Sequence, residues 1–257
     1  MIEIKNLTKI FKLTKKMKKE LKTKDNEKVA VDDLNLTIKE GEIFGILGTN
    51  GAGKTTTLRI ISTLLKPTSG TVEVNGLDTV KEGDKVREKI GFLTSEIKLD
   101  PNFTPDYLFD FFGELRNVPR EEIQARKEKL FKYFGIDEFK HKKIEELSTG
   151  MKQKAAIAVS LMHNPEIIIF DEPTSGLDII TAKSVLDYIK ELKNENKTII
   201  MSTHNMTEAE KVCDRIGIII DGKLVFEGTI EEAVAKTGTK DLEEAFFKFY
   251  SDEKGEN

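Results

Sequence analysis

The chain has 257 residues and a formal net charge of −4, with 38% hydrophobic and 33% charged residues. This length and composition fit one large α/β domain under a charged surface, and without an overall basic field we expect no nucleic acid partner. The one cysteine, Cys213, excludes a disulfide scaffold, and no stretch approaches the roughly 18 apolar residues that a membrane span needs. The first residues do not form a basic-then-apolar run, so we expect no signal peptide. If the protein serves a membrane process, we expect another polypeptide to supply the membrane part.

The first half of the chain predicts strands that lead into a glycine-rich loop. Residues 2–5 and 30–38 read as strands, and residues 34–38 alternate polar and apolar side chains, which is typical of a half-buried strand. A strand over 42–47 precedes the loop, and helical spacing over 55–65 follows it. Further strands are predicted at 71–74 and 90–93.

A lysine-rich insertion separates the first two predicted strands, between Lys12 and Lys28. It holds eight lysines, and the apolar residues Leu13, Met17 and Leu21 repeat every four positions. Two interpretations stay open. The segment could be a basic amphipathic helix at an anionic membrane surface, or a solvated helix packed on its own domain.

Residues 100–147 change in character, because aromatic and charged residues are dense and β-branched residues are sparse, which predicts a helical lobe. Its aromatic residues are Phe103, Tyr107, Phe109, Phe111, Phe112, Phe131, Tyr133, Phe134 and Phe139. Apolar runs at 167–170, 198–202 and 216–220 lack alternation, as expected of parallel strands buried on both faces. A hairpin over 218–228 turns at Asp221-Gly222, a type I′ pair. Apolar residues at helical spacing predict a helix in the C-terminal tail.

Residues 48–55 match the phosphate-loop pattern G-x-x-x-x-G-K-[ST] without a mismatch. The glycines let backbone N–H groups surround phosphate oxygens, and the following helix directs its positive end toward the same charge. Lys54 can reach the β- and γ-phosphates, and Thr55 can offer a hydroxyl to Mg²⁺. A chance glycine-rich turn is the alternative, but the loop lies between a buried strand and a helix, as the mechanism requires. The predicted nucleotide-binding residues here are Gly48, Thr49, Asn50, Gly51, Ala52, Gly53, Lys54, Thr55 and Thr56.

The apolar run at 167–170 ends in two acidic residues. Asp171 suits a Mg²⁺ ligand acting through water, and Glu172 suits a general base that polarises the attacking water. Ordinary surface acids at a strand end are the alternative. The sequence Asp-Glu-Pro-Thr-Ser-Gly-Leu-Asp over 171–178 argues against that alternative.

Five motifs in one order resemble the ABC transporter ATP-binding family over residues 2 to about 228. Besides the phosphate loop and the acidic pair, residues 147–151 (Leu-Ser-Thr-Gly-Met) resemble the ABC signature, and residues 175–178 resemble the D-loop. His204 resembles the switch histidine at the end of the next strand. Phe11 falls where the family places an aromatic ring against adenine.

The resemblance implies a P-loop NTPase with a mainly parallel central sheet, an N-terminal antiparallel β subdomain and an inserted helical subdomain. It implies a nucleotide-binding domain over 1–229, with the helical subdomain at about 97–163, and an amphipathic helical tail over 230–257. Two copies would pair head to tail and hold ATP and Mg²⁺ between them. Ser148 and the Gly150 backbone would meet the γ-phosphate across the interface, and Asp178 would link the two sites. Lys54, Glu172 and His204 would be the catalytic residues.

The same resemblance implies a membrane-spanning permease as partner and a peripheral position on the cytoplasmic face of the cell membrane. Residues 91–94 (Gly-Phe-Leu-Thr), the lysine-rich insertion and the Leu-Ser-Thr-Gly-Met signature are similar to ATP-binding subunits of sodium efflux pumps, among the ABC-2 type exporters. The sequence departs from the family at Thr149, at Met151 and at Ser95, which stands where a glutamine usually contacts Mg²⁺. Ser95 is the predicted metal-side residue, with Glu96 as the alternative.

Two other functions remain to be separated from ATP-driven transport. A non-transport ABC ATPase acting on nucleic acid or ribosomes usually carries two cassettes or a coiled-coil insertion, and this chain has one cassette and a short lobe. A regulatory module that binds ATP without hydrolysis would not need both Glu172 and His204. An ATP-hydrolysing subunit of an exporter is the function that the motifs favour.

Overall fold

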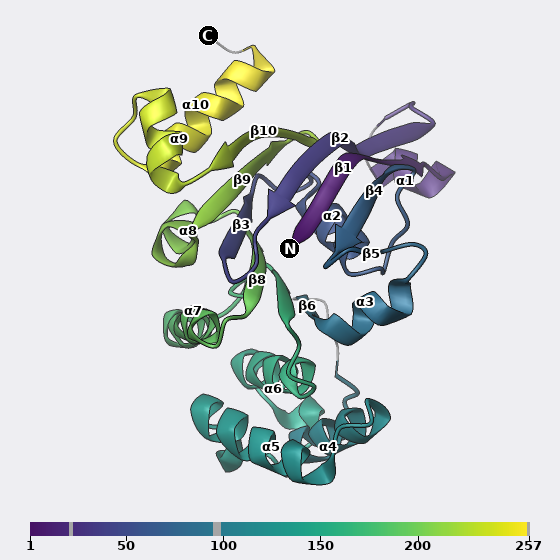
Figure 1. Ribbon diagram of the computed structural model, residues 1–257, viewed down its shortest axis with the longest axis vertical. Coiled ribbons are helices and arrows are strands. Elements are labelled where there is room, and N and C mark those ends of the chain that lie inside the picture. The colour runs from purple at the N-terminus through teal and green to yellow at the C-terminus, as the bar shows by residue number, and fades with distance from the viewer. Residues whose placement is uncertain (21–22, 95–98, 256–257) are drawn as a thin grey trace. The chain divides into compact units, whose positions relative to one another are not determined.

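The computed structural model describes residues 1–20, 23–94 and 99–255 and divides into two compact units (Figure 1). The first unit contains residues 1–88 and 200–257, and the second contains residues 89–199. Four antiparallel strands form one sheet, and mainly parallel strands form another, so the α/β class is confirmed. The predicted domain boundaries stay a prediction. Within the described ranges, no helix is long and apolar enough to cross a bilayer.

The antiparallel sheet lies in the first unit and has the strand order β2-β1-β4-β5. Its strands are β1 (Ile2–Lys12), β2 (Glu27–Ile38), β4 (Ser69–Val74) and β5 (Leu77–Asp78). The predicted alternation in β2 is confirmed, because Leu34, Leu36 and Ile38 are buried between exposed neighbours. Both β1 and β2 are longer than predicted. Their pairing continues to Lys12 opposite Glu27, and cross-strand hydrogen bonding outweighs the weak apolar pattern of these ends.

The lysine-rich insertion forms the tip of the β1–β2 hairpin. The backbone N–H of Leu13 donates to the Asn26 carbonyl at 2.8 Å, which continues the closure of the hairpin. Within the described part of the insertion, the helix is limited to α1 (Lys15–Glu20). Its lysines at 15, 16 and 19 are exposed. The structure thus shortens the predicted helix and leaves both interpretations of the insertion open.

The parallel strands of the first unit carry the phosphate loop. They are β3 (Ile43–Leu47), β9 (Arg215–Ile220) and residues 200–203 of β8 (Thr198–Thr203), in the order β10-β9-β3-β8 with the antiparallel β10 (Lys223–Gly228) at the edge. All five residues of β3 are buried, as predicted for a parallel strand covered on both faces. The predicted type I′ turn is confirmed, because Asp221 has φ 48° and Gly222 has φ 86°.

The helix after the phosphate loop, α2 (Lys54–Ile61), ends earlier than the predicted residue 65. The chain leaves the helix through Ser62 and Thr63, and Thr63 has a positive φ of 65°. The N–H groups of Leu64 and Leu65 both donate to the Arg59 carbonyl, at 2.9 and 3.0 Å. Apolar spacing predicts a longer helix because it cannot detect such a turn, in which hydrogen bonds that wrap back satisfy the last carbonyls.

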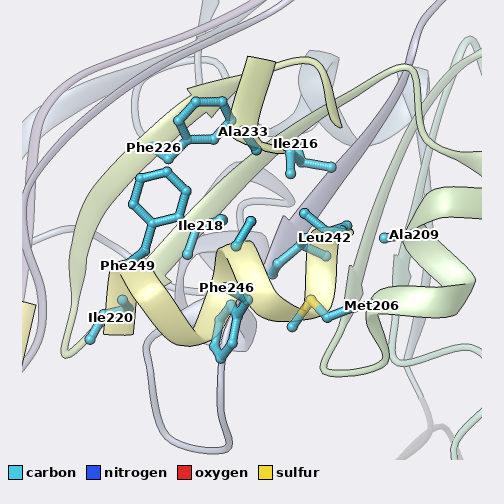
Figure 2. Packing of buried hydrophobic residues seen from close by; sticks show 12 residues of the cluster. Met206, Ala209, Ile216, Ile218, Ile220, Phe226, Ala233, Leu242, Phe246 and Phe249 are labelled. Carbon is cyan, nitrogen blue, oxygen red and sulfur yellow. The ribbon is translucent and has the colours of Figure 1, made fainter. Parts of the chain in front are cut away.

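The C-terminal tail folds into α9 (Ile230–Thr237) and α10 (Leu242–Lys254), so the predicted helical tail is confirmed. Thr229 and Glu232 form a capping box at the start of α9. Figure 2 shows the apolar face of α10 packed on side chains from β9, β10 and α8 (Met206–Val212). The buried cluster comprises Leu47, Met206, Ala209, Ile216, Ile218, Ile220, Phe226, Ala233, Leu242, Ala245, Phe246 and Phe249. The tail is therefore part of the core of the first unit.

The second unit contains the predicted helical lobe. Its helices are α4 (Pro105–Leu115), α5 (Arg120–Phe134), α6 (Thr149–Leu161) and α7 (Ile179–Asn194). Its strands β6 (Ile90–Thr94) and β7 (Ile167–Asp171) pair in parallel, with β7 between β6 and the first residues of β8. Buried Lys127 of α5 forms ion pairs with Asp106 (2.8 Å) and Asp110 (2.7 Å) of α4. The aspartate side chains are partly exposed, but Lys127 is not, so α4 must supply the partner for a buried cation and is thereby tied to α5.

Replacing Phe249 of α10 by alanine tests the tail cluster. Phe249 is 8% exposed and its ring centroid lies 5.2 Å from that of Phe226, whereas Phe247 on the same helix is 59% exposed. We expect Phe249→Ala to lower the free energy of unfolding by about 3–5 kcal/mol, because it leaves a cavity in a packed core. Urea denaturation measures the change, and Phe247→Ala is the matched control, expected within about 0.5 kcal/mol of the parent. Equal effects of the two variants would refute the packing of α10.

His163, in the second unit, provides a pH-dependent test. Burial lowers the pKa of its imidazole to about 4, and the positive charges of Arg116, Arg126 and Lys197 add to that shift. Its Nε2 lies 3.2 Å from the Ile90 carbonyl oxygen. Between about pH 6.5 and 4 the unfolded chain binds a proton at this histidine that the folded chain does not. The free energy of unfolding therefore decreases as the pH is lowered across this window.

We expect the stability advantage of the parent over His163→Gln to shrink by roughly 3 kcal/mol between pH 7.5 and pH 4, from 1.36 kcal/mol per pKa unit. Urea unfolding of both proteins along a pH series measures this difference. The same replacement at His141, which is exposed, controls for the general effect of acid. An advantage of His163 that stays constant over the series would contradict the buried, neutral imidazole.

Candidate nucleotide site

The predicted site residues fall into two groups, one in each compact unit. The first unit contains the phosphate loop, Phe11 and His204, and the second contains the signature residues Ser148 and Gly150, the acidic pair at 171–172 and Asp178. Ser95, predicted as a metal-side residue, and its alternative Glu96 lie outside the described residues.

The phosphate loop connects buried β3 to α2, as the motif requires. Gly53 immediately precedes α2 with φ 112°, and a Cβ atom there would lie 2.4 Å from the Ala30 carbonyl oxygen, so only glycine fits. The Lys54 ammonium is buried and donates to the carbonyls of Gly48 (2.7 Å) and Thr49 (3.1 Å). A buried cation beside the N-terminal end of a helix is suited to a polyphosphate, because both contribute positive potential at one place.

The chemistry of each predicted Mg²⁺ ligand suits an ion that arrives with a nucleotide. Within the described ranges, no group of three or more His, Cys, Asp or Glu residues could hold a metal ion. Mg²⁺ usually needs no such cage, since one or two carboxylates and the substrate phosphates complete its coordination. The predicted ligands, the Thr55 hydroxyl and the Asp171 carboxylate, are of the hard oxygen type that Mg²⁺ prefers.

Phe11 and His204 lie in the first unit at strand ends. Phe11 is half-buried near the end of β1, and the ammonium of Lys9 lies 5.2 Å from its ring centroid. One contact of the ring is therefore a cation–π pair, and a base would have to use the remaining surface. His204 follows β8 directly and is exposed, and the next residue, Asn205, caps α8 by accepting from the Glu208 N–H.

The acidic pair ends the fully buried strand β7. Asp171 is buried, and Glu172 has a left-handed φ of 51°. Few residues other than glycine, asparagine and aspartate adopt this conformation, and such strained residues cluster at active sites. The Glu172 carbonyl accepts from the Ser175 N–H at 3.2 Å, so the chain turns sharply after the acid. The strain supports a functional role for Glu172.

The signature and the D-loop meet at the start of α6 and α7. Ser148 caps α6 by accepting from the Met151 N–H at 3.3 Å, and a Cβ on Gly150 would lie 3.1 Å from the Thr181 hydroxyl. Asp178 caps α7 and accepts from the Thr181 hydroxyl at 2.7 Å. That hydroxyl, together with backbone N–H groups of the first turn of α7, holds the pKa of the Asp178 carboxyl below its usual value.

Three features of this region were missed in the sequence. The Gln153 side chain donates to the Pro173 carbonyl at 3.3 Å, which ties α6 to the chain after the acidic pair. Thr181 could have been found from the Asp-x-x-Thr spacing of a helix cap. Ile179 and Ile180 are 88% and 83% exposed, beside the capping aspartate. No sequence signal distinguishes them from the buried apolar residues of α7.

Comparison with known proteins identifies the fold and the family. A family model described as ABC transporter matches residues 31–175, and one described as AAA domain, putative AbiEii toxin, Type IV TA system matches the shorter stretch 143–210. The ABC transporter ATP-binding protein NatA of Bacillus subtilis is 43% identical over 225 residues, which cover 86% of this chain and 92% of NatA.

Other relatives differ in what their names say is transported. The linearmycin resistance ATP-binding protein LnrL of B. subtilis is 38% identical over 82% of this chain and 68% of LnrL. The methionine import ATP-binding protein MetN 1 of Oenococcus oeni is 37% identical over 90% of this chain and 65% of MetN 1.

Among solved structures, the ATP-binding cassette MJ0796, in a dimeric post-hydrolysis state bound to ADP and Pi, matches with a TM-score of 0.77. It is 32% identical, and the match covers 89% of this chain and 98% of the cassette. The P-loop NTPase fold predicted from the sequence is thereby confirmed. With its phosphate loop, acidic pair and signature region, and with a family match over more than half of its length, the chain belongs to the ABC transporter family as an ATP-binding, ATP-hydrolysing subunit.

Proposed function

We propose that two copies of this subunit pair head to tail and hydrolyse ATP to drive export through a separate membrane-spanning permease. Lys54 and the loop N–H groups hold the phosphates, while Thr55 and Asp171 hold Mg²⁺, which neutralises phosphate charge. Glu172 orients the attacking water and accepts its proton, and His204 stabilises the charge that develops on the γ-phosphate. Ser148 and Gly150 of the second copy complete the site.

The observation that carries this proposal is the exposed apolar surface next to the D-loop. Ile179 and Ile180 expose most of their side chains although they directly follow Asp178, whose hydrogen-bond partner Thr181 lies beside the signature residue Gly150. Adjacent exposed isoleucines in a signature region indicate an interface, because their burial against a partner is favourable. The dimeric state of the related cassette MJ0796 supports a second copy as that partner.

A second exposed apolar surface, on α4 and the residues just before it, suits the permease. The rings of Phe103, Tyr107 and Phe111 stack in a ladder, with centroid distances of 4.7 and 5.9 Å, and all three are exposed. The ladder lines a pocket of about 400 Å³. The buried ion pairs of Lys127 hold α4 beneath it. Exposed aromatic rings on a rigid helix form the kind of anchor that protein partners bind.

Export, and sodium as the exported ion, rest on the resemblance of residues 91–94, the signature and the lysine-rich insertion to sodium efflux ATPases. The name of the relative LnrL, a resistance protein, agrees with export, whereas the name of MetN 1 states import. The subunit would lie at the cytoplasmic face of the cell membrane. Co-expression with the product of the neighbouring gene, followed by measurement of sodium efflux, tests the direction and the ion together.

Replacing Glu172 by glutamine tests hydrolysis and pairing. Glutamine keeps the shape but cannot accept the proton, so we expect ATP affinity within about threefold of the parent and a loss of turnover of about 10²–10⁴-fold. Phosphate release measures turnover. With Mg-ATP bound and not hydrolysed, light scattering should detect a dimer.

The dimer interface is tested by adding Ile180→Arg to Glu172→Gln. A charge placed in the apolar contact should return the protein to a monomer, because the interface would then bury an unpaired cation. Leu64→Arg, at an exposed leucine outside the proposed interface, is the matched control and should leave the dimer intact. A strictly monomeric Glu172→Gln protein at saturating Mg-ATP, or a dimer unaffected by Ile180→Arg, would count against the proposed pairing.

The aromatic ladder is tested by Tyr107→Ser and Phe111→Ser together. In cells that co-express a partner permease, we expect the fraction of the subunit recovered with membranes to fall at least fivefold, since hot-spot aromatics typically contribute 2 kcal/mol or more. ATPase activity of the isolated subunit should be unchanged. Phe247→Ser on α10 is the control, an exposed phenylalanine that should not affect recovery. Equal recovery of both variants would remove the ladder as the docking surface.

A further inference from the structure

The turn between β9 and β10 contacts the phosphate loop at a backbone carbonyl. The N–H of Gly222 donates to the Ala52 carbonyl at 2.9 Å, and the Gly222 carbonyl accepts from the Asp32 N–H of β2 at 2.9 Å. One residue of the turn therefore bridges the loop to the antiparallel sheet. All of these residues belong to the first unit.

The bond to Ala52 fixes the orientation of one peptide unit of the loop. In a trans peptide the carbonyl and the N–H lie in one plane and point in opposite directions within it. Because the Gly222 N–H holds the Ala52 carbonyl, the N–H of Gly53 points away from the turn. A loop that binds phosphate through its N–H groups needs this orientation to be set before the ligand arrives, since ordering the loop on binding would reduce affinity.

The packing around this bond leaves little room for movement. A Cβ on Gly53 would lie 3.5 Å from the Gly222 Cα, and a Cβ on Gly48 would lie 2.4 Å from the Ile219 carbonyl oxygen. A Cβ on Gly222 would itself lie 3.1 Å from the Ala30 carbonyl oxygen. The loop, the turn and β2 are thus in backbone-to-backbone contact, where a single added methyl group would force a displacement.

The turn is also tied to the C-terminal helix. Lys254, in the last turn of α10, forms an ion pair with Asp221 and lies 5.7 Å from the Tyr250 ring centroid. An exposed pair contributes little by itself. The buried cluster in Figure 2 holds α10 against β9 and β10, and so supports both strands that lead into the turn.

We propose that the Asp221–Gly222 turn is a positioning element for ATP, which sets the affinity of the phosphate loop by holding the Ala52–Gly53 peptide in its binding orientation. Gly222 is then a positioning residue that does not touch the nucleotide. The proposal rests on the assignment of residues 48–56 as the phosphate site.

The same unit contains a second turn that serves as a matched control. Asn75 and Gly76, between β4 and β5, have φ values of 49° and 76°, close to the 48° and 86° of Asp221 and Gly222. A Cβ on Gly76 would meet no atom within 4 Å. Alanine at either glycine adopts a similarly unfavourable backbone conformation, but only at Gly222 does it press on the backbone behind the phosphate loop.

The experiment compares Gly222→Ala with Gly76→Ala in the full chain. The chain contains no tryptophan, so a fluorescent ATP analogue carrying a methylanthraniloyl group reports binding, and a thermal melt without nucleotide reports stability. We expect both variants to lower the melting temperature. Only Gly222→Ala should raise the Kd for the analogue, by about tenfold, as expected of a displaced binding group. Equal Kd values for the two variants would overturn the proposal.

Two further variants keep the outcome interpretable. If Gly222→Ala does not fold, Gly222→Asn and Gly76→Asn replace the pair, because asparagine tolerates positive φ while its Cβ still meets Ala30. Lys54→Ala tests the underlying site. Unchanged binding in Lys54→Ala would reject the phosphate loop assignment itself, whereas loss of binding there with equal Kd values for the two glycine variants would reject only the turn.

Discussion

The structure around the predicted phosphate loop in the first unit depends on one constraint. A loop that directs its N–H groups at a phosphate cannot satisfy its carbonyls with the regular hydrogen bonds of a helix or sheet. Here the carbonyls accept hydrogen bonds from the neighbouring turn and from the lysine of the loop itself. The Gly222 N–H holds the Ala52 carbonyl, and the Lys54 ammonium holds those of Gly48 and Thr49. Buried backbone groups need such partners, so the strands and turns around the loop are part of the site.

In the second unit, backbone conformation and helix caps hold the predicted site residues in place. Glu172 is held in a strained left-handed conformation at the end of a fully buried strand, and helix caps fix Ser148 and Asp178. These features place the predicted functional groups at the ends of helices and strands, where neighbouring packing limits their movement. The two adjacent isoleucines beside Asp178 are exposed in the single subunit, and the proposed pairing would bury them.

The helical lobe combines an apolar exterior on α4 with buried charge beneath it. The buried Lys127 ammonium pairs with two partly exposed aspartates, since a cation left in the interior without a partner would be costly. Such a set fixes which faces of α4 and α5 meet, because any other register would leave a charge unpaired. The stacked rings of Tyr107 and Phe111 are thereby displayed on a helix with a defined orientation, which agrees with the proposed docking surface.

Local chemistry in the sequence was enough to predict the phosphate loop, the acidic pair, the buried parallel strands and the Asp221-Gly222 turn. In each case the residue types and their spacing are themselves the requirement: glycines for close approach, unbroken apolar runs for strands covered on both faces, and Asp-Gly for two positive φ values. Tertiary structure decided the rest. The extension of β1 and β2 depends on cross-strand partners, and the early end of α2 depends on a wrapped turn at Thr63. The contact of Gly222 with Ala52 joins residues 170 positions apart. Ile180 is exposed because the rest of the fold leaves its side chain uncovered, which its local sequence does not indicate. Such features arise from contacts between distant segments, which a pattern of neighbouring residues does not encode.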